Sequence, residues 1–164
     1  MSSDGPSLST SPATSKLLFR PLPFVLRPSR EEKVTLRKFA RLLTQTVFQG
    51  SVVCLFTDDR ELHKLNHLFL GHDYPTDVLS FPAPESDAGE IAISVERADA
   101  QALEYRHSRI DEIRILMLHG FLHLAGMDHE GDDGEMARAE QKWRAEFHLP
   151  TTLIERAALT ATLL

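Results

Sequence analysis

The sequence predicts a single domain in which a small mixed sheet is packed by helices, rather than a helical bundle or a β-sandwich. Three observations lead to this expectation. The chain has 164 residues, enough for one sizeable hydrophobic core and hardly enough for two. Short apolar runs that are typical of strands alternate with longer segments of helical periodicity. No internal repeat divides this alternation. The elements add up to four strands and about five helices.

The first part of the chain is expected to lack structure. Ser, Thr and Pro dominate residues 1–15, which leaves too little apolar surface to offset the entropy of ordering, so these residues should form a disordered tail. The domain is expected to span residues 16–150, with residues 151–164 as a C-terminal tail of no clear structure. Within the domain, the apolar segment 17–26 contains two prolines, so a strand there should be short or lie at an edge.

A first helix is predicted directly after this segment. Ser29 and Glu32 form a capping-box pattern ahead of an amphipathic stretch of about 18 residues, and Gly50 is a natural stop. Further strands are expected at 52–56, 78–81 and 90–94, where apolar and β-branched residues gather. Further helices are expected from Asp58 to before Gly71 and over 95–105, 110–124 and about 133–147.

Composition indicates a cytoplasmic protein with no membrane partner. Apolar residues make up 42% of the chain and charged residues 26%, and no apolar run approaches the roughly 20 residues that span a bilayer. The N-terminus also lacks the charged-then-apolar layout of a secretory signal. Cys54 is the only cysteine, so no internal disulfide can form, and its apolar surroundings favour a small core residue over a nucleophile.

The charge is uneven along the chain. The net charge of −6 argues against a protein that coats nucleic acid by bulk attraction. Nevertheless, the stretch from Lys16 to Arg41 carries eight cations against only Glu31 and Glu32. This stretch is either a local basic face or an ordinary solvated helix face.

The segment from His119 to His129 reads H-G-F-L-H-L-A-G-M-D-H and predicts a metal site. His119 and His123 are four residues apart on an expected helix, so both imidazoles project from one face, as two ligands of one zinc ion must. Gly126 can take the left-handed conformation that ends a helix, after which His129 can approach the same ion. Three imidazoles leave a fourth position open, which is typical of a catalytic zinc site. A histidine-rich helix end without a metal would have to produce all three positions by accident.

The spacing H-x-x-x-H-x-x-G-x-x-H is also that of the metzincin metalloproteases. In those enzymes the residue after the first histidine is a glutamate that acts as the general base. Here Gly120 holds that position, so the sequence argues against peptide hydrolysis.

Three ordered motifs make the sequence resemble the YbeY family, which comprises bacterial, single-strand-specific, zinc-dependent endoribonucleases that mature ribosomal RNA. The block H-G-x-L-H-L-x-G-x-D-H is matched from His119 to His129. Leu65–Asn66 followed by the segment 71–82 matches L-N-x-x-x-x-G-x-D-x-P-T-D-V-L-S-F-P, and the segment 89–94 matches G-[DE]-I-x-I-S. The resemblance covers about residues 20–150.

The resemblance implies a compact α+β domain with a zincin-like metal helix and the zinc in a cleft beside a small sheet. His119, His123 and His129 would hold one Zn²⁺ per chain, which would polarise a water molecule or a phosphoryl oxygen of single-stranded RNA. The implied role is maturation of the 3′ end of small-subunit (16S) rRNA and ribosome quality control, with the ribosome and ribosomal proteins as partners. No separate general base is assigned.

Other residues near the motifs have open roles. Asp128 is a candidate to orient an imidazole or to stabilise the turn. Asp73, Thr76, Asp77 and Ser80 either line the cleft or form a rigid turn. The candidates for an RNA backbone track are Arg30, Lys33, Arg37, Lys38 and Arg41.

One position departs from the family pattern. Many members have Arg before the glycine that opens the G-x-D-x-P-T loop, where a cation would stabilise charge developing on the phosphate. Here the residue is Leu70, and His72 is either a substitute or an ordinary loop histidine. The alternatives to an endoribonuclease are another zinc-dependent hydrolase, such as a metalloprotease-like enzyme, and a non-catalytic ribosome-associated zinc protein.

Overall fold

A computed structural model describes residues 12–74, 76–150, 154 and 156 of the chain. The described residues form four strands and five α-helices. The strands are β1 (Ser15–Phe19), β2 (Ser51–Thr57), β3 (Val78–Ala83) and β4 (Ala88–Ser94). The helices are α1 (Arg30–Thr46), α2 (Asp59–Leu70), α3 (Val95–Tyr105), α4 (Arg109–Leu124) and α5 (Glu135–Glu146). Two short 3₁₀ turns, Phe24–Leu26 and Pro84–Ser86, complete the order of elements.

The expected tails fall mostly outside the described residues. Residues 1–11 are not described, and β1 begins at Ser15, one residue before the expected start of the domain. Of the expected C-terminal tail, only Ile154 and Arg156 are described.

The four strands form one mixed sheet in the order β1-β2-β4-β3. β1, β2 and β4 run parallel, whereas β3 pairs antiparallel with β4, with Val78 opposite Ile93. The predicted small mixed sheet is therefore confirmed. β1 is a five-residue edge strand that ends before Pro21, as expected for a segment whose prolines cannot donate to a ladder.

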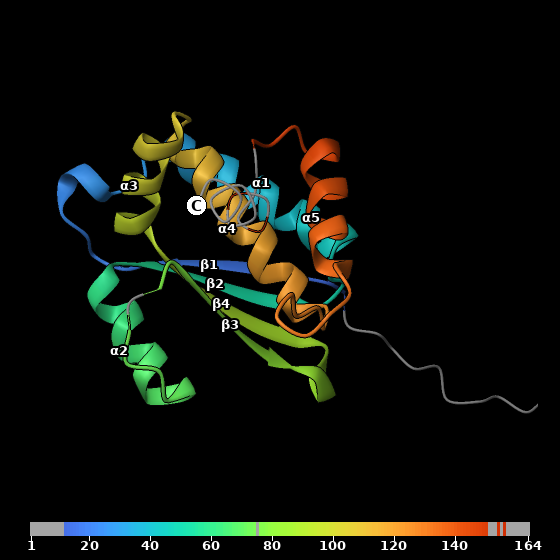
Figure 1. The fold of residues 1–164 in the computed structure, drawn as a ribbon. Helices are drawn as coiled ribbons and strands as arrows, with labels where there is room; N and C mark the ends of the chain where they lie inside the picture. Colours follow the sequence, from blue (N-terminus) through green and yellow to red (C-terminus); the bar gives the residue numbers. More distant parts are fainter. Residues whose placement is uncertain (1–11, 75, 151–153, 155, 157–164) are drawn as a thin grey trace, which may run out of the picture.

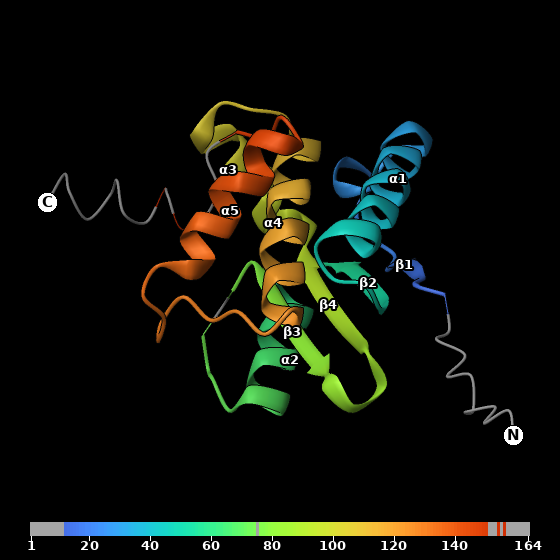
Figure 2. The same ribbon diagram turned by 90° about the vertical axis from the view of Figure 1, so that its right-hand side faces the viewer.

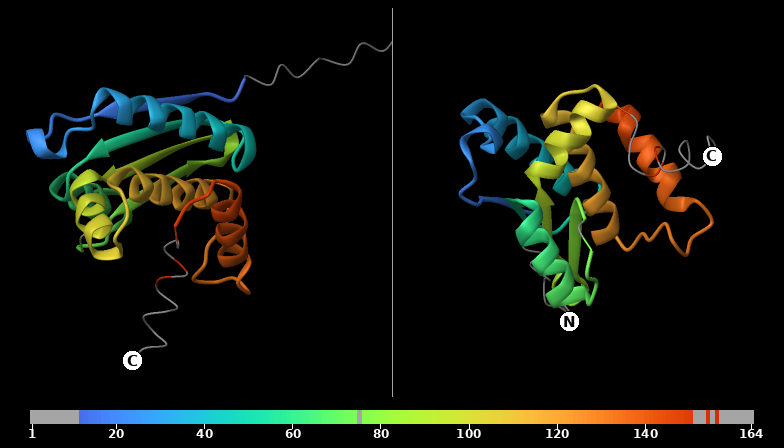
Figure 3. Two further views of the ribbon diagram at one scale, coloured as in Figure 1. Left: turned by 90° about the horizontal axis from the view of Figure 1, so that it is seen from above. Right: turned by 60° about the vertical axis from the view of Figure 1, so that its left-hand side comes forward.

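Helices cover the two faces of the sheet unequally. Figure 1 shows α1, α3, α4 and α5 on one face and α2 on the other. After a quarter turn, α4 runs in front of β3 and β4, which it contacts (Figure 2). From above, α1 lies beside α4 and over β1, and α5 lies against α4 on its other side (Figure 3). This α+β architecture places the central helix α4 between the sheet and α5.

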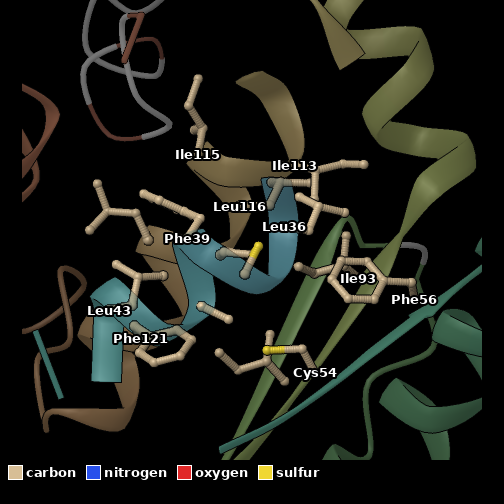
Figure 4. Close-up of a cluster of buried hydrophobic side chains, with 14 of the residues drawn as sticks. Leu36, Phe39, Leu43, Cys54, Phe56, Ile93, Ile113, Ile115, Leu116 and Phe121 are labelled. Carbon is tan, nitrogen blue, oxygen red and sulfur yellow. The ribbon is translucent and has the colours of Figure 1, made fainter. Parts of the chain in front are cut away.

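The main hydrophobic core fills the space between the sheet and these helices. Figure 4 shows Cys54, Phe56 and Ile93 pointing from the strands toward Leu36 of α1 and Phe121 of α4. In β2 the buried residues alternate, so every second side chain faces this core. The burial predicted for Cys54 is confirmed, and it raises the pKa of the thiol to about 12.

The helix boundaries follow the local sequence with one exception. The capping box of Ser29 and Glu32 is present, and Gly71 ends α2 with a left-handed φ of 69°. The expectation that Gly50 stops α1 is wrong, because α1 ends at Thr46. Gly50 is instead a point of close approach, where a Cβ would lie 2.3 Å from the backbone oxygen of Asp87. Among the described helices, none combines the length and apolar character needed to cross a membrane.

Candidate metal centre

The candidate site lies at the C-terminal end of α4. This helix begins at Ser108, whose Oγ accepts a hydrogen bond from the Asp111 amide at 3.0 Å. Helix α4 is apolar on most of its circumference because it is buried between the sheet and the other helices. His119 and His123 lie in its last two turns, as the spacing predicted.

The chain reverses direction after α4 through a Schellman motif. The Gly126 amide donates to the carbonyl of His123 at 3.0 Å, and the Met127 amide donates to that of Leu122 at 3.1 Å. Gly126 has a φ of 91°, a left-handed conformation that costs glycine little. The predicted helix end at Gly126 is confirmed, and it turns the chain back toward the two histidines.

The rings of His119 and His123 are fixed by acceptors on their Nδ1 atoms. His119 Nδ1 lies 3.1 Å from Glu140 Oε2 on α5, and His123 Nδ1 lies 2.9 Å from the carbonyl oxygen of Met127. A carboxylate and a carbonyl can only accept, so both Nδ1 atoms carry the proton. The two Nε2 atoms, which are 3.1 Å apart, therefore face one another with their lone pairs.

His129 completes the group from the loop after the Schellman motif. One ring nitrogen from each histidine can be chosen so that all three atoms lie within 4.8 Å of one another. Three imidazoles whose ring nitrogens lie this close together are a donor set suited to Zn²⁺, whose bonds to histidine are about 2.0–2.1 Å long. The three histidines could therefore hold one metal ion.

The surroundings of His123 favour its neutral form. Burial lowers the pKa of His123, and the neighbouring His119 lowers it further. The hydrogen bond to the Met127 carbonyl acts in the opposite direction. A lowered pKa suits a metal ligand, since only the neutral ring can donate a lone pair.

The histidines open into a cavity of about 500 Å³ between the end of α4 and the α2–β3 loop. Such a volume is within the range of ligand clefts. The sequence left open whether Asp73, Thr76, Asp77 and Ser80 line the cleft or form a turn. Thr76, Asp77 and Ser80 line the cavity. Asp73 is not among the lining residues; its carboxylate lies 2.7 Å from the ring of His63, which lowers its pKa.

The α2–β3 loop is tied to α2 by the asparagine of the second sequence motif. Asn66 is buried, and its Nδ2 donates to the carbonyl of Tyr74 at 2.9 Å. The backbone carbonyl of Asn66 also accepts from the His72 amide at 3.3 Å. At the other end of the loop, Asp77 Oδ2 accepts from Gln101 Nε2 of α3 at 3.2 Å. The described residues at the two ends of the loop are thus held against α2 and α3.

Gly120 is the point at which α4 comes closest to the sheet. A Cβ at this position would lie 3.0 and 3.1 Å from two carbons of Ile91 and 3.3 Å from Ser80 Oγ. Ser80 Oγ also donates to the Gly120 carbonyl at 3.1 Å. In this fold a glutamate at position 120 would be directed into the sheet, so the residue that metzincins use as a base has no space here.

The carboxylate of Asp128 makes a contact within the turn that follows α4. Its Oδ1 accepts from the Glu130 amide at 3.1 Å, and the imidazole of His119 is oriented by Glu140 instead. Sequence reasoning did not identify Glu140. The available signal was a charged residue four positions after Met136, on the face of α5 that the structure buries.

The basic candidates on α1 lie apart from the cavity. α1 packs over β1 at one edge of the sheet, whereas the cavity includes residues of β3 at the other edge. Two of the candidates already have a local partner: Lys33 Nζ lies 4.8 Å, and the Arg37 guanidinium carbon 6.0 Å, from the ring centroid of Phe19. None of the candidates Arg30, Lys33, Arg37, Lys38 and Arg41 is among the described residues that line the cavity.

Comparison with known proteins identifies the family. The family model described as Endoribonuclease YbeY matches residues 29–148. The Endoribonuclease YbeY of Solibacter usitatus is 49% identical over 148 residues, which cover 90% of this chain and 97% of that protein. The Endoribonuclease YbeY of Helicobacter pylori strain Shi470 is 38% identical over 133 residues, covering 79% and 93%. The solution structure of TM1509 from Thermotoga maritima aligns with a TM-score of 0.53 at 27% identity, covering 82% of this chain and 92% of that one. The chain therefore belongs to the YbeY endoribonuclease family.

Proposed function

We propose that this protein is a zinc-dependent endoribonuclease that cuts single-stranded RNA and matures the 3′ end of small-subunit rRNA in the cytoplasm. The observation that carries the proposal is the convergence of three imidazoles on one point at the wall of an open cavity. Family membership supplies the class of reaction, because the curated relatives are named endoribonucleases.

His119, His123 and His129 would hold the zinc through ring nitrogens. A bound zinc ion supplies Lewis-acid chemistry at a phosphoryl oxygen or a water molecule. Glu140 and the Met127 carbonyl fix the tautomers of the first two rings, which keeps their Nε2 lone pairs available. Ser80 joins α4 to β3 beside these ligands, so the sheet supports the cavity wall.

An aromatic pair at the cavity supports the preference for single strands. The rings of His72 and Tyr74 are stacked, with centroids 5.2 Å apart and an interplanar angle of 17°, and Tyr74 is 53% exposed. Both residues line the cavity. An unpaired base can stack on such rings, whereas a base inside a duplex is already covered by its neighbours.

The charges around the cavity support a model in which RNA is cut at the cavity and held in part by a different surface. Its described lining residues include Asp77, Asp128 and Glu130 but no Lys or Arg. Phosphate groups near the metal would therefore be held mainly by the ion itself. The basic face of α1 is the proposed contact for a more distant part of the RNA backbone, where Lys and Arg neutralise phosphates.

Cleavage of a single-stranded RNA oligonucleotide by the purified protein tests the activity. We expect cleavage that stops when a chelator removes the metal and resumes when zinc is added back. A duplex of the same sequence should be cut far more slowly, and the His119→Ala variant should be inactive. Zinc-loaded protein that leaves single-stranded RNA intact and cuts a peptide substrate would support the alternative hydrolase.

The ribosomal role requires a test in cells. A strain with His119→Ala in place of the native protein should accumulate small-subunit rRNA with an unprocessed 3′ end at a normal level of the protein. Binding of the protein to ribosomal particles should survive this substitution. Normal rRNA ends in that strain would favour the non-catalytic ribosome-associated protein over the nuclease.

A further inference from the structure

The carboxylate of Glu140 joins two distant parts of the chain. Oε2 lies 3.1 Å from His119 Nδ1 on α4, and Oε1 accepts from the Ile154 amide at 3.2 Å. Glu140 is fully buried, so both contacts are shielded from water. The group that orients a proposed metal ligand is therefore itself held by a residue of the C-terminal segment.

Arg156 attaches the same segment to α4. Its guanidinium donates to both oxygens of Glu112, at 3.0 Å and 3.2 Å, and lies 4.2 Å from the ring centroid of Tyr105. Glu112 is fully buried and also lies 2.5 Å from His107 Nε2. A bidentate ion pair in such surroundings has a fixed geometry, and removal of one partner leaves a buried charge.

The two attachment points follow one line along α4. Glu112 and His119 are seven residues apart, which places them on the same face of the helix two turns from each other. The C-terminal segment reaches this face at Glu112 through Arg156, and at His119 through Ile154 and Glu140.

Helix α5 is only partly buried, so contacts with the C-terminal segment add to what holds it in place. Only Met136 and Glu140 are fully buried among its twelve residues, and Ala139 and Trp143 are partly buried against the core. The N-cap residue of α5, Gly134, has a left-handed conformation and no side chain, and the Met136 amide donates instead to Asp132 Oδ2 at 2.8 Å. A peripheral helix with few fully buried side chains opens more easily than the core, and when α5 moves away, the contact between Glu140 and His119 is lost.

We propose that Ile154 and Arg156 form a C-terminal strap that holds Glu140 against His119 and so increases the affinity of the site for zinc. The strap lies beyond residue 148, where the match to the family model ends. Glu140 is a positioning residue, and the strap acts through it. The inference rests on the proposed role of His119 as a zinc ligand.

The affinity of the full-length protein for zinc, measured by competition with a chromogenic chelator, tests the strap. We expect Arg156→Ala to weaken zinc binding about 10-fold, the lower range for loss of a group that orients a metal ligand. Arg60→Ala changes an exposed arginine on α2 and should leave the affinity unchanged. Wild-type affinity in a folded Arg156→Ala variant would overturn the proposal.

A double-mutant cycle separates positioning from a general loss of stability. Glu140→Gln offers one oxygen to the two donors, His119 Nδ1 and the Ile154 amide, so one of the contacts must be lost. In the Glu140→Gln background, Arg156→Ala should weaken zinc binding by much less than 10-fold. Two full, independent effects would show that the strap does not act through Glu140.

A second variant covers the case in which Arg156→Ala fails to fold. Ile154→Pro removes the amide that donates to Glu140 and leaves the ion pair of Arg156 in place. It should also lower zinc affinity, and unchanged affinity would contradict the strap. His119→Ala is measured in parallel: wild-type zinc affinity in that variant would refute the proposed metal centre, whereas a loss there with no loss in the strap variants would refute the strap alone.

Discussion

The Nε2 atoms of His119 and His123 lie 3.1 Å apart without a proton to share. Each ring directs its protonated Nδ1 at an acceptor, which leaves two lone pairs pointing at one another. In the absence of a cation these lone pairs repel, and a metal ion between them converts the repulsion into two bonds. The pair is thus arranged for a ligand-bound state, and a metal that binds only the folded protein should stabilise it.

Replacing His123 by alanine tests the metal centre directly. The variant should contain well below one zinc ion per chain after dialysis, because two imidazoles bind much more weakly than three. His67→Ala changes an exposed histidine of α2 and serves as the matched control. Metal analysis by mass spectrometry gives the zinc content of both proteins. A folded His123→Ala variant that retains one tightly bound zinc ion would contradict the assignment.

The stability of the metal-free protein should depend on the protonation of His123. Burial and the nearby His119 lower its pKa in the folded state below the ordinary value of 6.5. The unfolded chain therefore binds more protons, so this contribution to stability is complete above pH 6.5 and is lost as the pH falls through the folded pKa. Urea unfolding of chelator-treated protein between about pH 7.5 and about pH 5 measures it. His123→Gln should lose less stability over this interval than the wild type, and an equal loss would exclude His123 as the cause.

A side chain at position 120 should destabilise the fold. Gly120→Glu would force a carboxylate against Ile91 and Ser80, and burial of an unpaired charge should cost about 3 kcal/mol or more. Gly120→Ala should cost less, because the gain in helix propensity of about 1 kcal/mol offsets part of the crowding. Urea denaturation compares the three proteins. A Gly120→Glu variant as stable as the wild type would show that α4 can move away from the sheet.

Cys54 should be protected from thiol reagents by the fold. It is fully buried on β2, and burial raises the pKa of its thiol to about 12. The reactive thiolate is therefore almost absent at about pH 8, and the reagent has no access. Reaction with a chromogenic disulfide should be slow in buffer and rapid in denaturant. Rapid labelling of the native protein would show that β2 opens locally.

Local sequence was sufficient to predict most elements of the fold. The capping box at Ser29, the left-handed Gly71 and the helix end at Gly126 each act within a few residues, so they can be read from adjacent positions. The prediction that Gly50 ends α1 is wrong for the opposite reason. Its role is set by the backbone of Asp87, a neighbour in space that no local pattern indicates.

The candidate site also could be predicted only where its residues are close in the sequence. The three histidines could be predicted from the sequence because they lie in one stretch of eleven residues, two of them on an expected helix and the third after its end. Glu140 was missed because its contact with His119 spans 21 residues and depends on how α5 packs on α4. The position of the basic candidates on α1 also depends on strand order, since β1 and β3 occupy opposite edges of the sheet. Hydrophobic periodicity predicts strands but not their order.

An arginine at position 70 should strengthen the interaction with RNA. Leu70 lines the cavity and is 44% exposed, so a longer side chain can extend toward solvent without disturbing the core. The described lining carries no Lys or Arg, and a cation there would reach a phosphate near the metal. With one added phosphate contact, the dependence of log affinity on log salt should steepen by about 0.7 for a single strand. Leu70→Gln, which adds a polar group without charge, should leave the slope unchanged. Binding of a single-stranded oligonucleotide to metal-free protein over a range of salt concentrations measures the slope. An unchanged slope for Leu70→Arg would place the RNA backbone away from this side of the cavity.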